Sequence, residues 1–194
     1  MKTKILWYLM TILAAFVALY GFVFLLIPDM GSEEIRERFL GKPIVGLSHV
    51  YGGGLALLVG PFLLNSNIRN RFLNTHRIVG RVYLLAVLAS GLAGLYSATV
   101  TFGGLSAQMG FGALAILWLW SGAMALVRIR QGDLARHQVW MYRNYALTYA
   151  AVTLRFALPA IIANGVPFEA AYQTIAWMCW VPNLIFVDWI LARK

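Results

Sequence analysis

The chain has 194 residues, of which 61% are hydrophobic and only 12% charged, and its mean hydropathy is +0.73. Soluble domains carry about twice this charged fraction and about 45–50% apolar residues, so the composition excludes a soluble globular protein and predicts one embedded in a lipid bilayer. The net charge of +9 would suit nucleic-acid binding in a soluble protein. Here the cations lie between apolar stretches, so we expect no nucleic-acid partner.

Six apolar stretches reach the length of about 20 residues that a membrane span needs. They cover residues 5–27, 43–64, 77–100, 107–127, 138–161 and 170–191. The sequence therefore predicts an all-α fold, a six-helix transmembrane bundle forming a single integral membrane domain over residues 1–194. The first stretch is too long for the apolar part of a signal peptide, so we expect it to be retained as a span. Pro182 predicts a kink in the last one.

The segments between the predicted spans differ in charge. Basic residues gather in segments 2–4, 69–77, 128–136 and 193–194. Of the three alternate loops, the first mixes cations with carboxylates and the other two contain no cation. Cytoplasmic segments of membrane proteins carry the excess of Lys and Arg. We therefore expect both termini on the cytoplasmic side.

Small residues recur at four-residue spacing in the third span, at Ala86, Ser90, Gly94 and Ala98, and the second span has a similar series at Gly46, Gly53, Ala56 and Gly60. Such ladders allow helix backbones to approach closely, which is a main source of helix association in lipid. They predict tight packing of these spans.

All three histidines fall in or beside predicted spans. His49 is about 9 Å below the outer end of the second span, while His76 and His137 open the third and fifth spans at their inner ends. An ionisable group in a membrane is a candidate functional site. Two chemistries fit: ligation of b-type haem, which needs an axial imidazole and space for a flat ring, and proton relay. Gly80 follows His76 by one turn, and Gly53 follows His49 by one turn.

We expect His76 and His137 to face each other and to be the metal ligands of one b-type haem near the inner face. His49 would then need an outer partner, for which Met109 lies at about the right depth. The alternative for His76 and His137 is that they are interfacial residues that cap helix ends.

Arg81, Arg143 and Arg155 lie inside predicted spans, where each would cost about 2.5–3.5 kcal/mol near the bilayer centre. In a haem protein they would bind propionates, in a transporter an anionic substrate, and otherwise they would reach lipid headgroups. Arg143 and Asp188 lie at comparable depth, so we expect an ion pair between them.

A second polar site is predicted in the outer half of the bundle. Arg155 and His49 both lie about 9 Å below the outer surface, so we expect them to line one polar cavity. The alternative is that Arg155 reaches the headgroups and that His49 bonds a backbone carbonyl.

Four motifs contain these residues: HxxGG at His49, HRxxGRxY at His76, HxxWMxRxxAL at His137, and VTLR ending at Arg155. Together they resemble a family of bacterial predicted membrane proteins of unknown function, and this resemblance implies a multi-pass protein of the bacterial inner membrane. The arrangement also resembles, more loosely, six-helix di-haem b-type cytochromes, which pair histidines from helices 2 and 4 and from helices 3 and 5. His76 and His137 match the second pair, whereas the fourth span has no histidine.

The sequence thus predicts an inner-membrane protein of redox type that binds haem b for electron transfer, with a membrane redox partner or a larger complex. Two alternatives stay open. One is a transporter or channel for an anion or proton, and the other is a cofactor-free accessory or assembly subunit. The sequence contains no phosphate-binding glycine loop and no zinc-spaced Cys/His set, which leaves hydrolase and nucleotide-driven functions without support.

Overall fold

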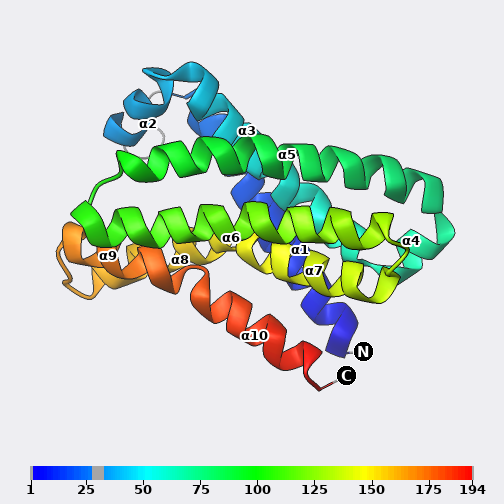
Figure 1. Cartoon of the computed structure of the whole chain (residues 1–194). Helices are drawn as coiled ribbons and strands as arrows, with labels where there is room; N and C mark the ends of the chain where they lie inside the picture. Colours follow the sequence, from blue (N-terminus) through cyan, green and yellow to red (C-terminus); the bar gives the residue numbers. More distant parts are fainter. Residues whose placement is uncertain (1, 28–32, 194) are drawn as a thin grey trace. The chain divides into compact units, whose positions relative to one another are not determined.

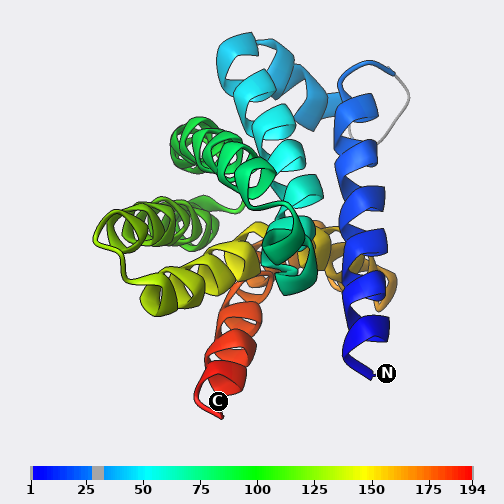
Figure 2. The ribbon, with the colours of Figure 1, turned by 90° about the vertical axis from the view of Figure 1, so that its right-hand side faces the viewer.

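The computed structural model describes residues 2–27 and 33–193. These residues form ten helices and no strand. The chain divides into two compact units, residues 1–93 and 94–194. Figures 1 and 2 show the helices in chain order by colour.

The first unit contains α1 (Lys2–Phe24), α2 (Glu33–Leu40), α3 (Pro43–Leu64), α4 (Ser66–Arg71) and most of α5 (Leu73–Thr99). Small residues allow α1 and α3 to approach each other (Figure 2). At Gly54 an added Cβ would lie 2.7 Å from the ring of Phe22. Near the start of α1, the Trp7 indole N–H donates a hydrogen bond to the Pro61 carbonyl of α3 at 2.9 Å, which also joins the two helices.

The second unit contains α6 (Gly104–Arg130), α7 (Leu134–Thr148), α8 (Ala150–Ala163), α9 (Phe168–Met178) and α10 (Val181–Leu191). The helices α6 and α7 form a hairpin and lie side by side (Figure 1).

Two residues close this hairpin. Gly132 adopts a φ of 78°, a left-handed conformation that glycine adopts without strain. Asp133 then caps α7 by accepting a hydrogen bond from the backbone N–H of Arg136. The turn therefore depends on a residue that tolerates a positive φ and on a side chain that can cap α7.

The six predicted spans are confirmed. Among the described residues, six helical segments are long and apolar enough to cross a membrane, and they are Lys4–Phe24, Pro43–Leu64, Leu73–Thr99, Gly104–Arg130, Leu134–Ala163 and Phe168–Leu191. The second has the predicted bounds, and the ends of the others differ from the prediction by up to four residues. The protein is therefore an integral membrane protein in a lipid bilayer.

The structure adds two short helices and two interruptions to the predicted spans. The polar helices α2 and α4 lie between spans, and the fifth span is interrupted at Tyr149. The last span breaks between Met178 and Val181, which confirms the kink predicted from Pro182. Pro182 lies in the first turn of α10, where its missing N–H costs least.

We propose that α4 and the α6–α7 turn face the cytoplasm, because both are rich in arginine. Asn67 and Gln131 are exposed there, and Asn164 is exposed in the turn between α8 and α9. Cysteines at Asn67 and Gln131 should react with a membrane-impermeant maleimide only after the inner face is exposed, whereas a cysteine at Asn164 should react in intact cells. The native Cys179 is fully buried and gives a low background. Labelling of Asn67→Cys in intact cells would contradict this topology and indicate the opposite orientation.

Candidate functional site

The His137 ring is held at the closed end of the α6–α7 hairpin. Its Nδ1 lies 2.9 Å from the carbonyl oxygen of Ala125 in α6. Because a carbonyl oxygen only accepts hydrogen bonds, Nδ1 is the donor, so whenever the ring is neutral its lone pair is on Nε2. Histidines that ligate metals through Nε2 commonly donate their other N–H in this way.

A buried donor lies close to this histidine in the hairpin. Arg128 follows Ala125 by one turn of α6, and its Nη1 donates to Oε1 of Gln131 at 3.1 Å. Its Nε is buried and has no hydrogen-bond partner among the described residues. Leaving a buried donor unsatisfied costs about 1–3 kcal/mol. An anionic oxygen bound at this position would remove that cost.

His49 takes part in a reciprocal contact between α3 and α5. Its Nδ1 lies 3.2 Å from the Ser90 carbonyl oxygen, and the Ser90 hydroxyl donates to the His49 carbonyl at 2.8 Å. The ring of Phe39 stacks on the His49 ring, with centroids 5.9 Å apart. The bond from the His49 ring to a backbone carbonyl was one of the two alternatives predicted for this residue.

The glycines after His49 lie where the two helices meet. An added Cβ would lie 3.1 Å from Ser90 Cβ at Gly52, and 3.1 Å from Ser90 Oγ at Gly53. The tight packing predicted from small residues is confirmed here. Gly53 is predicted as a cofactor contact. The close approach of Ser90 explains the absence of a side chain at this position.

His76 lies in the first turn of α5 and is half-buried. A Cβ added at Gly80, one turn after His76, would meet no atom of the described residues within 4 Å. Arg81 is exposed. Ser90, the partner of His49, lies about 21 Å further along α5 at 1.5 Å per residue, so the first unit does not bring its two histidines together.

The remaining predicted site residues belong to the second unit. Met109 and Arg155 are both exposed, the former by 59%. The predicted pairing of His76 with His137, and the predicted cavity shared by His49 and Arg155, each join residues of different units. Both stay predictions.

The ion pair predicted between Arg143 and Asp188 is confirmed. Arg143 Nε in α7 lies 2.8 Å from Asp188 Oδ1 in α10, and the side chains are 31% and 45% exposed. The guanidinium also lies over the Trp140 ring, 4.9 Å from its centroid. Each charge alone would be costly inside a span, and pairing removes much of that cost.

Next to this pair is a buried hydrogen-bond network that the sequence analysis missed. Asn144 is fully buried, and its Nδ2 donates to the Trp118 carbonyl and to the Ser121 hydroxyl, both at 2.8 Å. The Trp118 indole N–H donates to Thr148 Oγ1 at 2.8 Å. Polar residues four apart in an apolar helix, as Asn144 and Thr148 are, were the available signal. These bonds fix α7 against α6.

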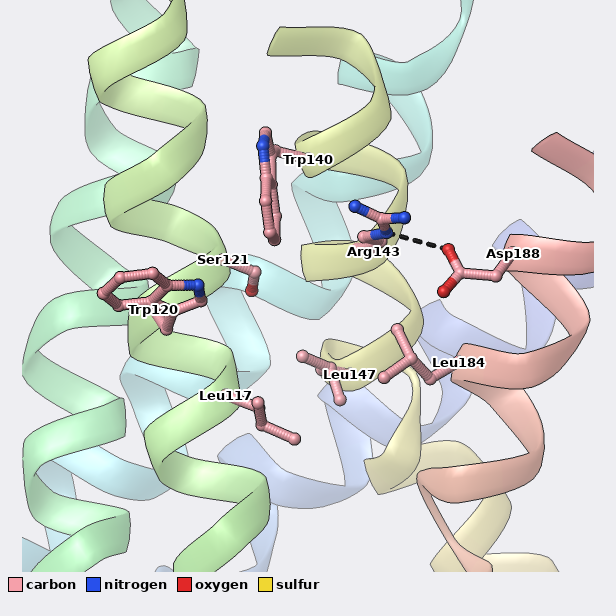
Figure 3. A pocket seen from close by; sticks show the side chains of 8 residues that line it. All are labelled: Leu117, Trp120, Ser121, Trp140, Arg143, Leu147, Leu184 and Asp188. Atoms are coloured by element: carbon pink, nitrogen blue, oxygen red, sulfur yellow. Dashed lines mark hydrogen bonds and ion pairs between the residues drawn. The ribbon is translucent and has the colours of Figure 1, made fainter. Parts of the chain in front are cut away.

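A groove of about 200 Å³ opens between α6, α7 and α10 beside the ion pair. Its lining residues are Leu117, Trp120, Ser121, Trp140, Arg143, Leu147, Leu184 and Asp188 (Figure 3). It therefore combines apolar and aromatic walls with one pair of charges. The described residues contain no group of three or more His, Cys, Asp or Glu placed to hold a metal ion.

We expect the ion pair to stabilise the fold by a modest amount, because both side chains are partly exposed. Asp188→Asn should lower the free energy of unfolding by about 1–2 kcal/mol, less than the 3–5 kcal/mol typical of a fully buried pair. Exchanging the two charges, Arg143→Asp with Asp188→Arg, should recover part of the loss. The measurement is thermal unfolding in detergent. Asp133→Asn, which removes the exposed pair with Arg136, is the control and should cost less than 1 kcal/mol.

A known protein family matches most of the chain. A family model described as "Predicted membrane protein (DUF2306)" matches residues 46–191, which include all three histidines, Arg143 and Asp188. The family is one of unknown function. No curated protein and no solved structure matches the chain. Because the match covers well over half of its length, the chain belongs to the DUF2306 family of predicted membrane proteins.

Proposed function

We propose that this protein is a redox protein of the bacterial inner membrane that binds b-type haem, with His137 as the residue that would hold the iron. The observation that carries the proposal is the hydrogen bond from His137 Nδ1 to the Ala125 carbonyl. It holds the ring in the tautomer that presents Nε2, the atom through which a helix histidine ligates haem iron. Bound haem would supply one-electron chemistry, and electrons would enter and leave through a membrane partner.

Arg128 gives this proposal independent support. Haem b carries two propionates, and a carboxylate is one of the acceptors that a guanidinium donor binds strongly. The buried Arg128 Nε lies one turn from the residue that holds His137. Arg128 would therefore bind a propionate while His137 binds the iron.

The spectrum of the purified protein tests the proposal. Protein made in cells supplied with a haem precursor should show a Soret band that shifts on reduction with dithionite. His76→Ala then tests the predicted second ligand, because haem that keeps His137 as its one histidine ligand should stay bound and change from low to high spin. A protein without visible absorption would contradict the redox proposal and leave the transporter and accessory-subunit functions.

A further inference from the structure

We propose that the groove between α6, α7 and α10 binds a flat, uncharged, carbonyl-bearing amphiphile of the quinone class. The inference rests on residues other than His137 and Arg128, so it does not depend on haem binding. Its basis is the shape of the groove, the donors that it offers, and the direction in which its polarity changes.

The walls of the groove suit a planar ring. Trp120 comes from α6 and Trp140 from α7, while Leu184 and Asp188 close the side formed by α10 (Figure 3). The volume of about 200 Å³ is small and suits a ring with short substituents. Aromatic side chains stack on flat π-systems in offset or edge-to-face geometry, which gives them a preference for such a ligand.

Arg143 provides the hydrogen-bond donors. Its ion pair with Asp188 is made through Nε, and a guanidinium carries four further N–H bonds on its two terminal nitrogens. The side chain is 31% exposed beside the groove. A quinone carbonyl could therefore accept a hydrogen bond from Arg143 without breaking the ion pair.

The charge of the groove favours a neutral ligand over an anionic one. Arg143 and Asp188 cancel each other, so an incoming phosphate or carboxylate would meet the Asp188 carboxylate at short range and be repelled. A neutral carbonyl compound meets no such repulsion. This separates a quinone from an anionic lipid headgroup, the other amphiphile that could lie in this position.

The groove is also polar at one end and apolar at the other. Asp188 lies one turn before the end of α10, where Arg193 stacks on Trp189 at 3.6 Å, a pairing typical of a membrane interface. Leu117, Leu147 and Leu184 lie further from the basic ends of α6, α7 and α10. A ligand headgroup would therefore lie near the interface, with its isoprenoid tail directed into the bilayer.

The test is the partition of decylubiquinone between micelles that contain the full-length protein and protein-free micelles at equal detergent. Saturable binding is expected. Trp120→Leu should weaken it by about five- to tenfold, whereas Trp120→Phe should retain most of it. Trp189→Leu, an exposed tryptophan outside the groove, is the matched control and should bind as the native protein does.

Two further variants test the polar end. Asp188→Asn should bind decylubiquinone within about threefold of the native protein, because the ligand uses Arg143. The double variant Arg143→Met with Asp188→Asn removes both charges, so no unpaired charge remains and the protein should fold. Without the Arg143 donors, its affinity for decylubiquinone should fall by about tenfold. Thermal unfolding confirms that each variant is folded.

Partition equal to that of protein-free micelles would overturn the inference. So would displacement of decylubiquinone by phosphatidylglycerol, which would identify an anionic-lipid site. An equal loss in Trp120→Leu and Trp189→Leu would also overturn it. Repeating the titration with His137→Ala separates this inference from the haem proposal: unchanged quinone binding in a protein without haem would support the groove alone.

Discussion

Replacing His137 with alanine is expected to abolish the Soret band of the purified protein, and added imidazole is expected to restore it. The substitution removes the nitrogen that would bind the iron and leaves a space of the same shape. The Ala125 carbonyl stays in place to accept a hydrogen bond from the N–H of free imidazole. Recovery of the band would identify His137 as a ligand, because a purely structural role would not be restored by a small molecule that binds iron.

The matched control for this experiment is Gln138→Ala. Gln138 is the next residue in α7 and is half-buried like His137, but it has no ligand atom of comparable strength for haem iron. Its spectrum should equal that of the native protein. A Soret band of unchanged intensity in His137→Ala would contradict the assignment of the ligand.

Replacing Gly110 with leucine is expected to lower the free energy of unfolding by about 3 kcal/mol. Gly110 lies where α6 meets α9, and an added Cβ would lie 2.9 Å from both the Cβ and the carbonyl oxygen of Ala176. These atoms belong to or adjoin the backbone of α9, so a larger side chain must push the helices apart. Overpacking of this kind costs about 1–3 kcal/mol, and the close contact to backbone places this site at the upper end.

Gly112, in the same helix, provides the control. An added Cβ there would meet no atom of the described residues within 4 Å. Gly112→Leu should therefore be neutral or stabilise by up to about 1 kcal/mol, because leucine has the higher helix propensity. The stabilities of the two variants are compared by thermal unfolding in the same detergent. Equal stability of the two would show that α6 and α9 do not pack closely at Gly110.

The spans could be predicted because apolar length is a direct physical requirement of the bilayer. The same criterion does not detect α2, whose sequence EEIRERFL is short and charged. It also does not detect α4, which depends on the Asn65 side chain accepting from the backbone N–H groups of Asn67 and Ile68. The Asn65 cap therefore supports α4, and α2 packs against α3, so neither helix depends on hydrophobic length.

Part of the candidate site could be predicted because a charge inside a span is costly, and few arrangements of neighbouring side chains remove that cost. Arg143 and Asp188 are such a case, since each needs an opposite charge at the same depth. Asn144 is different, because an uncharged amide in an apolar helix does not indicate which carbonyl or hydroxyl it will bond. The glycines beside His49 suggested space for a cofactor, but tertiary packing places Ser90 there. Buried Arg128 Nε likewise has no signal in the sequence.

Titration of the apoprotein with hemin is the most direct test of the proposed haem site. The Soret absorbance, measured against empty micelles, should rise steeply and saturate at a fixed ratio of hemin to protein. The His137→Ala variant should give no such saturation. If the native protein instead gives the same gradual rise as empty micelles, hemin only dissolves in the detergent, and the protein has no haem site at His137.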